Sequence, residues 1–237
     1  MEALISHYAN NNVSTHLKKI AMRLFERLFG KKGNGIKLSK PIDSLDFFNE
    51  FKVISEQYWK VTDINRSTFG FQIQQNTTWL PGLTDEQIDN FEKDLGFNFP
   101  TPLRDFYKTM NGLSKPGINV YGDSGEPYAY SPIFYSYPND IGTIKENIDW
   151  IYKENDVDLQ KLKLLGASRI FPVCGHRFML IDEPLNPILS MYGQDIIYWS
   201  DSLSKLIAEH IFDDIYNASE FESNPDETPK INYWIDK

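Results

Sequence analysis

The chain has 237 residues, one cysteine and a formal net charge of −9. The length fits one domain with an extension, and the single Cys174 excludes an internal disulfide. The first residues lack a basic and apolar leader pattern, and no stretch approaches the roughly 18 apolar residues of a membrane span. We therefore expect a cytoplasmic protein.

The charge is unevenly distributed along the chain. Residues 1–40 hold eight Lys or Arg and two Glu, which gives +6, so the remaining 197 residues carry −15. This asymmetry indicates a basic arm on an acidic body. An acidic body argues against nucleic acid as the main ligand and is compatible with a basic protein partner.

Residues 14–29 have apolar residues at helical spacing and an opposite basic face, so they predict an amphipathic helix. Three interpretations stay open for it: a membrane-surface helix, a nucleic-acid contact, or a helix packed on the body or a partner. The glycine-rich stretch 30–35 indicates a flexible joint. A second helix is expected at 43–59.

Residues 69–75 alternate apolar and polar side chains, with Phe69, Phe71 and Ile73 on one side. This period of two predicts a half-buried strand. We expect these three side chains to face the core.

A pair of short helices follows at 84–112. Thr84 and Gln87 have the spacing of a capping box, and Gly96 is suited to end the first helix. We expect Thr101 to cap the second helix with Pro102 at its first position, and Asn111-Gly112 to terminate it. The expected core residues are Phe91, Leu95, Leu103, Phe106 and Met110.

The segment 118–138 is rich in Tyr, Gly and Pro and predicts two strands joined by turns. Thr143 and Glu146 then resemble a capping box for a helix with Ile144, Ile148 and Ile151 facing inward. Residues 169–175 are expected to form a loop and a strand. Further strands are expected at 177–182, 188–192 and 195–199, with 177–182 and 188–192 forming a hairpin. A last helix is expected at 200–212.

Beyond the last helix, residues 213–227 contain six acidic residues and no basic one. A solvated tail is the common interpretation of such a run, and an imitation of nucleic acid toward a basic toxin is the alternative. Residues 231–235, INYWI, are apolar enough to dock back on the body.

The order of these elements resembles the SUKH superfamily, whose founding member regulates cell-wall glucan synthesis in yeast. The resemblance rests on three stretches and covers about residues 66–215. They are LTDEQIDNFEKDLGFNFPTPLRDFYKTMNG at 83–112, IFPVCGHRFMLID at 170–182 and IIYWSDSLSKLI at 196–207. The residues at the matching structural positions are Gly96, Pro100, Asn111, Gly112, Asp182 and Asp201.

The resemblance implies an α+β fold with a twisted, mostly antiparallel sheet and helices packed against it, here with a helical N-terminal extension. It also implies a non-enzymatic role, because many bacterial relatives look like immunity proteins that neutralise a polymorphic toxin, often a nuclease. On this basis the chain divides into an extension at 1–65, a SUKH-like domain at 66–215 and an acidic tail at 216–237.

Aromatic and acidic residues between positions 121 and 137 are the candidate partner-binding surface. Tyr gives large contact area at low entropic cost and is enriched at binding hot spots. Tyr also has a high strand preference, so a purely structural role is the alternative. The candidates are Tyr121, Asp123, Glu126, Tyr128, Tyr130, Tyr135 and Tyr137.

Catalytic and metal sites have weak support in the sequence. Cys174 and His176 are two residues apart, but no third group is evident that would orient the base. Asp182 is expected to bind backbone donors at a strand end rather than to act in acid–base chemistry. The four histidines are scattered, so we expect no metal or other cofactor.

The sequence therefore favours a binding module for a basic toxin. A regulatory scaffold of a cell-wall or membrane-linked complex is the alternative among binding proteins. An enzyme that uses Cys174 or Asp182 is the alternative from another class.

Overall fold

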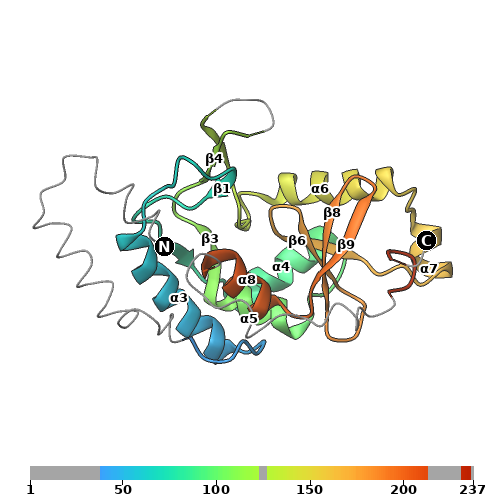
Figure 1. Cartoon of the computed structure of the whole chain (residues 1–237). Coiled ribbons are helices and arrows are strands. Elements are labelled where there is room, and N and C mark those ends of the chain that lie inside the picture. Colours follow the sequence, from blue (N-terminus) through green and yellow to red (C-terminus); the bar gives the residue numbers. More distant parts are fainter. Residues whose placement is uncertain (1–37, 123–126, 213–230, 236–237) are drawn as a thin grey trace, which may run out of the picture. The chain divides into compact units, whose positions relative to one another are not determined.

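The structure is a computed structural model that describes residues 38–122, 127–212 and 231–235. Leu38–Lys237 forms a compact unit by its internal contacts. The helix expected at 14–29 and most of the acidic tail lie outside the described residues. The described helices and strands, shown in Figure 1, are α3 Leu45–Val61, β1 Gly70–Gln72, β2 Trp79–Pro81, α4 Asp85–Leu95, α5 Thr101–Thr109, β3 Met110–Leu113, β4 Gly117–Val120, β5 Ala129–Ser131, α6 Ile141–Glu154, α7 Leu159–Leu164, β6 Ile170–Cys174, β7 Arg177–Leu180, β8 Ile188–Tyr192, β9 Asp195–Ser200 and α8 Leu203–Phe212.

The described strands form three sheets, in the orders β1-β4-β5, β2-β3 and β6-β7-β8-β9. Every strand pairing in these sheets is antiparallel. The predicted α+β class is confirmed, and the expected hairpin is the β7–β8 pair. Among the described residues, no helix is long and apolar enough to cross a membrane.

Helix α3 confirms the helix expected at 43–59 and supplies much of an aromatic core. Its N-cap Ser44 accepts a hydrogen bond from the Phe47 amide, and its buried face packs against later elements. The ring of Phe48 lies 5.8 Å from that of Phe106, and the ring of Phe51 lies 5.7 Å from that of Phe212. Helix α3 thus belongs to the compact unit, although it precedes residue 65. The division of the chain into domains stays a prediction.

The helix pair α4–α5 follows the expected capping closely at its start. The Thr84–Gln87 capping box is present, and Gly96 ends α4 in the left-handed conformation with φ +80°. The start and the end predicted for α5 both differ from those in the structure. Pro100 is the N-cap and Thr101 is already helical, and α5 ends at Thr109. The expected terminator Asn111-Gly112 lies instead in strand β3.

Two further expectations about burial and helix starts are wrong. Phe69 and Phe71 do not face a core, since they are 77% and 42% exposed. Helix α6 begins at Ile141 with Asp140 as N-cap, so Thr143 is not a cap. The Asp140 carboxylate accepts from the Ser136 amide and hydroxyl, both at 2.7 Å, and so fixes the turn before the helix. The expected inward residues of α6 are confirmed as buried: Ile144, Ile148 and Ile151.

Residues 231–235 dock on the body as expected. Ile231 and Trp234 are each 2% exposed, and the Trp234 indole N–H donates to the Ser168 carbonyl at 2.9 Å.

The first turn of α8 is stabilised by Asp43, a residue far away in the chain. The Asp43 carboxylate accepts from the Ser204 amide at 2.7 Å and from the Leu203 amide at 3.4 Å.

Candidate partner-binding surface

The sheet β1-β4-β5 carries a group of exposed aromatic side chains. In its register Phe71 faces Asn119, which faces Ala129, while Ile118 pairs with Tyr130. Figure 1 shows β1 and β4 projecting at the top of the view, away from α3 and α5. We call this group the arm surface; it consists of Phe69 (77% exposed), Phe71 (42%), Tyr121 (43%), Tyr128 (46%) and Tyr130 (64%).

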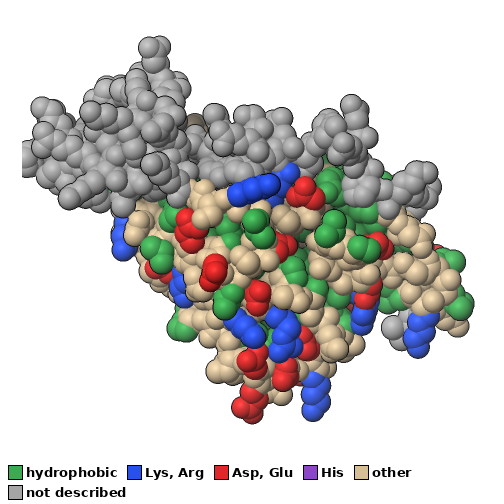
Figure 2. Space-filling model, turned by 90° about the horizontal axis from the view of Figure 1, so that it is seen from below, with side chains coloured by type: hydrophobic (Ala, Val, Ile, Leu, Met, Phe, Trp, Pro, Cys, Tyr) green, Lys and Arg blue, Asp and Glu red, His purple; other side chains and the backbone are tan. Residues whose placement is uncertain are grey.

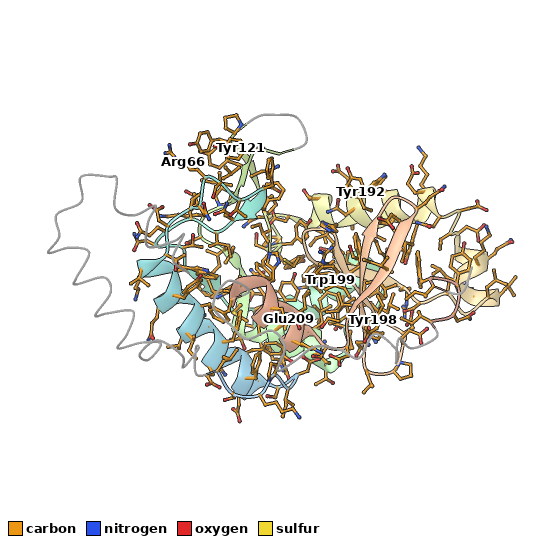
Figure 3. All side chains as sticks on the ribbon, in the orientation of Figure 1. Arg66, Tyr121, Tyr192, Tyr198, Trp199 and Glu209 are labelled. Carbon is orange, nitrogen blue, oxygen red and sulfur yellow. The ribbon has the colours of Figure 1, made fainter. Side chains whose placement is uncertain are left out.

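Tyr121 has a left-handed backbone conformation with φ +58°, which is uncommon for a residue with a side chain. Its ring contacts that of Phe69 at a centroid distance of 5.6 Å. The following Gly122 approaches the side chain of Asn119 closely, since a Cβ on Gly122 would lie 2.0 Å from the Asn119 side-chain nitrogen Nδ2. The turn at 121–122 therefore positions Tyr121 against Phe69. Figure 3 labels Tyr121 at this end of the sheet.

The acidic candidates Asp123 and Glu126 lie outside the described residues. Their part in a binding surface stays a prediction. Figure 3 labels Arg66 near the same end of the sheet as Tyr121, and Arg66 is exposed.

The structure places Tyr135 away from the arm surface. It is 5% exposed, and its hydroxyl accepts a hydrogen bond from the Asn147 side chain at 2.9 Å. Burial raises the pKa of Tyr135 to about 12, so the phenol is neutral at physiological pH. Its environment is that of a core residue.

Tyr137 is half-buried and has structural partners as well. Its ring stacks on Phe91 at 4.5 Å, and its hydroxyl donates to Asp94 at 2.8 Å. The Asn111 side chain bonds both the amide and the carbonyl of Tyr137, each at 2.8 Å. The seven sequence candidates are thus not one surface: Tyr121, Tyr128 and Tyr130 are exposed on the small sheet, with Tyr130 on the opposite face from Phe71, while Tyr135 and Tyr137 join the helix pair to the sheets.

The other residues of the family-like motif have local structural partners. Pro100 starts α5, and Gly112 has φ +80°. A Cβ on Gly112 would lie 2.8 Å from that of Ser136, so only glycine fits that crossing. Asp201 is exposed and lies 3.6 Å from Lys205 in the next turn.

Asp182 binds a backbone donor, as expected, and also an arginine. Its carboxylate accepts from the Arg169 amide at 2.9 Å and from the Arg169 guanidinium Nε at 2.8 Å. The Arg169 hydrogen bonds hold the pKa of the Asp182 carboxyl below its usual value. A carboxylate tied in this way is a poor proton acceptor for general base chemistry.

Cys174 lies on β6 and is 1% exposed. Burial raises the pKa of its thiol to about 12, so the reactive thiolate is not formed at neutral pH. His176 is exposed on the turn that follows, whereas the thiol is enclosed by core residues. Within the described part of the chain, no three His, Cys, Asp or Glu side chains are grouped as a metal site.

Sequence reasoning missed a second exposed aromatic surface, on the sheet β6-β7-β8-β9. Strand β9 alternates exposed and half-buried residues, and Ile197 and Trp199 are 50% and 42% exposed. Tyr192, at the end of β8, is 64% exposed. The sequence DIIYW at 195–199 predicted a strand, but its run of four apolar or aromatic residues gave no sign that one face is uncovered.

Figure 2 shows another face of the molecule, on which side chains of both charge signs are interspersed among hydrophobic ones. Ion pairs join α4 and α5: the Arg104 guanidinium lies 2.7 Å from the Glu92 carboxylate and 2.9 Å from that of Asp89, and the Lys108 ammonium lies 2.8 Å from the Asp85 carboxylate. Because opposite charges pair with each other here, this pair of helices has little net electrostatic potential that could attract a charged partner.

The fold and these surfaces define an α+β domain whose candidate sites are exposed aromatic patches. The family model for the SMI1/KNR4 family (SUKH-1) matches residues 82–214, more than half of the chain, and the protein belongs to this family. Neither the comparison with curated proteins nor that with solved structures gave a match. The matched range includes Tyr121, Tyr128 and Tyr130, but not α3 or β1.

Proposed function

We propose that the protein is a non-enzymatic protein-binding module, and specifically an immunity protein that binds and neutralises a polymorphic toxin. The observation that supports this proposal is the arm surface, five exposed aromatic side chains on one small sheet of a SUKH-1 family member. Exposed aromatic groups of this kind are typical of binding surfaces, where a few aromatic residues carry most of the affinity.

The charge of the chain supports a basic partner. Residues 41–237 carry −15, and Asp123 and Glu126 lie between Tyr121 and Tyr128 in the sequence. Charge complementarity of this kind mainly accelerates association, whereas the aromatic contacts determine how long the complex lasts. The two contributions can therefore be measured separately.

The test is a kinetic binding measurement against the toxin domain encoded next to this gene, at low and high salt. Tyr130→Ala should speed dissociation about tenfold or more, because it removes a large, exposed contact. The double variant Asp123→Lys, Glu126→Lys should slow association. Arg66→Glu is the matched control of opposite sign and should accelerate it.

A protection assay in cells should follow the same order, with Tyr130→Ala failing at lower toxin doses than the wild type. The proposal is wrong if the association and dissociation rates change neither with salt nor with any of these substitutions while the variants stay folded. An acidic partner domain would contradict the electrostatic part alone.

A further inference from the structure

The outer face of the sheet β6-β7-β8-β9 carries an arginine among exposed aromatic residues. Arg177 on β7 pairs in register with Ser190 on β8, which pairs with Ile197 on β9, so the three side chains share one face. The register shifts by one residue between Leu189 and Ile188, which leaves Trp199 without a partner in the ladder. Such a bulge re-aims the side chain that it carries.

Trp199 is aimed at the arginine. The Arg177 guanidinium lies 3.5 Å from the centroid of the Trp199 ring and also donates to the Ser190 hydroxyl. Tyr192 extends the patch toward α6, where its ring contacts that of Trp150 at 5.3 Å. Figure 3 shows Tyr192 and Trp199 along the same pair of strands. We call this patch the β9 surface; it consists of Trp150, Arg177, Tyr192, Ile197 and Trp199.

Arg177 differs from Arg104 and Arg169 in having no carboxylate partner among the described residues. Arg104 and Arg169 each bind a carboxylate, through Glu92 and Asp182. No carboxylate of residues 38–122, 127–212 or 231–235 lies within ion-pair distance of Arg177. Arg177 is half-buried, and this burial lowers the pKa of its guanidinium.

A partly desolvated guanidinium is costly unless an anion pairs with it. The Trp199 ring lies against the guanidinium and Ser190 takes one N–H group, which leaves the other N–H groups at the rim for a carboxylate. The exposed side chains of Ile197 and Tyr192 lie on the same surface and would exclude water from such a pair.

We propose that the β9 surface binds a partner protein through one Asp or Glu side chain flanked by apolar residues, with the carboxylate pairing with Arg177 and the apolar neighbours packing on Ile197 and Trp199. Asp195 is exposed at the hairpin end of β9, opposite Tyr192, and would repel a second acidic group. The preferred segment therefore carries a single acidic residue rather than an acidic run. This surface is separate from the arm surface and has the opposite charge preference.

The test uses two capped hexapeptides, identical except for a central Glu or Gln between Val and Leu. The indole N–H signals of the full-length protein are followed by NMR, and Trp199→Phe assigns the Trp199 signal. The Glu peptide should shift this signal saturably at millimolar concentration, with about tenfold weaker binding of the Gln peptide.

Arg177→Gln should abolish the difference between the two peptides, and Arg177→Lys should retain part of it because the charge stays while the planar fork is lost. Tyr130→Ala, on the arm surface, is the matched control and should leave both titrations unchanged. Thermal unfolding of each variant verifies that it is folded.

Equal binding of the two peptides, or no response of Trp199, would overturn the proposal. A concentration-dependent dimer in sedimentation that Ile197→Lys abolishes would also overturn it, because a second copy of the chain would then be the occupant. Both results leave the proposed function of the arm surface untouched, since that surface is tested by different residues.

Discussion

Two aromatic regions of the molecule have similar composition and opposite environments. Around α3 and α5, the ring of Phe106 contacts those of Phe48 and Trp79, and the three side chains are at most 4% exposed. On the sheet β1-β4-β5, Phe69 and Tyr130 are 77% and 64% exposed. The difference comes from the neighbouring elements: helices from distant parts of the chain cover the first group, whereas Phe69 and Tyr130 project from the small sheet into solvent.

The comparison teaches that aromatic content alone does not separate core from binding surface. A side chain becomes core only when a second element supplies contact atoms on its other side.

Removing α3 should have the greatest effect, because it uncovers the aromatic core. A chain that starts at residue 38 should unfold cooperatively, whereas one that starts at residue 62 should be molten or insoluble. The loss of Phe48, Phe51 and Trp59 together, at about 3–5 kcal/mol for each large aromatic, exceeds a typical stability of about 5–15 kcal/mol at its lower end.

Thermal unfolding followed by near-ultraviolet circular dichroism distinguishes the two truncated chains. A cooperative transition in the chain that lacks α3 would show that residues 66–215 fold alone, as the predicted domain division requires. The core described for α3 would then be dispensable.

Phe106→Ala should destabilise the protein by about 3–5 kcal/mol, because it opens a cavity among four aromatic neighbours. Phe69→Ala is the matched control on the arm surface and should change the free energy of unfolding by less than about 0.5 kcal/mol. Urea unfolding measures both. Similar values for the two variants would remove the distinction between the regions.

The cap of α8 should have a smaller effect. Asp43→Ala removes the acceptor for the Ser204 and Leu203 amides and should cost about 1 kcal/mol. Asp43→Asn keeps a capping oxygen and should cost much less at neutral pH. Urea unfolding at about pH 7 compares them, and equal losses for the two variants would show that the hydrogen bonds are not the source of stability.

The pH dependence of Asp43 has a defined sign. Burial raises the pKa of this carboxyl above its usual value of 3.8, so the folded protein binds the proton more tightly than the unfolded chain. The stability contributed by protonation is present below pH 3.8 and is lost as the pH rises through the folded-state pKa. Asp43→Asn should therefore gain on the wild type as the pH rises from about 3.5 to 7.

Asp182 should show the opposite dependence, since Arg169 lowers its pKa. The stability that the ionised Asp182 carboxylate contributes is present above pH 3.8 and is lost as the pH falls through the folded-state pKa. Because both side chains are more than a third exposed, solvent screening reduces this contribution.

The smallest effect is expected at Cys174 and His176. If the proposed immunity function is correct, Cys174→Ser and His176→Ala should leave protection intact, because the thiol is buried and protonated. The measurement is cell survival at matched protein levels, after thermal unfolding has verified the fold. Loss of protection by a folded Cys174→Ser variant would restore the enzyme hypothesis.

Local signals in the sequence predicted most helices and strands. Thr84 with Gln87 and the final Gly96 specify α4 through hydrogen bonds within one turn of the chain, so neighbouring residues suffice to predict them. The Thr143–Glu146 pattern failed because Asp140 binds Ser136 and starts α6 earlier. Asp140 is the N-cap without a side-chain capping bond, so contacts in the preceding loop determine where the helix starts.

Burial was less predictable, because it depends on distant elements. The alternation at Phe69 and Phe71 predicted a strand correctly but could not show that no layer covers it. Tyr130 and Tyr135 are five residues apart and chemically identical, yet only Tyr135 lies against Asn147 of α6. Arg177 and Trp199 are 22 positions apart in the chain, and only the sheet register brings them together.

The cap of α8 by Asp43 has a consequence for synthesis on the ribosome. The two partners are separated by 160 residues for the Leu203 amide and 161 for the Ser204 amide. At roughly 5–20 residues per second, α8 emerges about 8–30 s after α3. During this interval Phe51 has no Phe212 to contact, so the part of α3 that packs on α8 stays uncovered, although α5 has already emerged to contact Phe48. Synthesis speed therefore sets how long this chain is exposed to aggregation before its core can close.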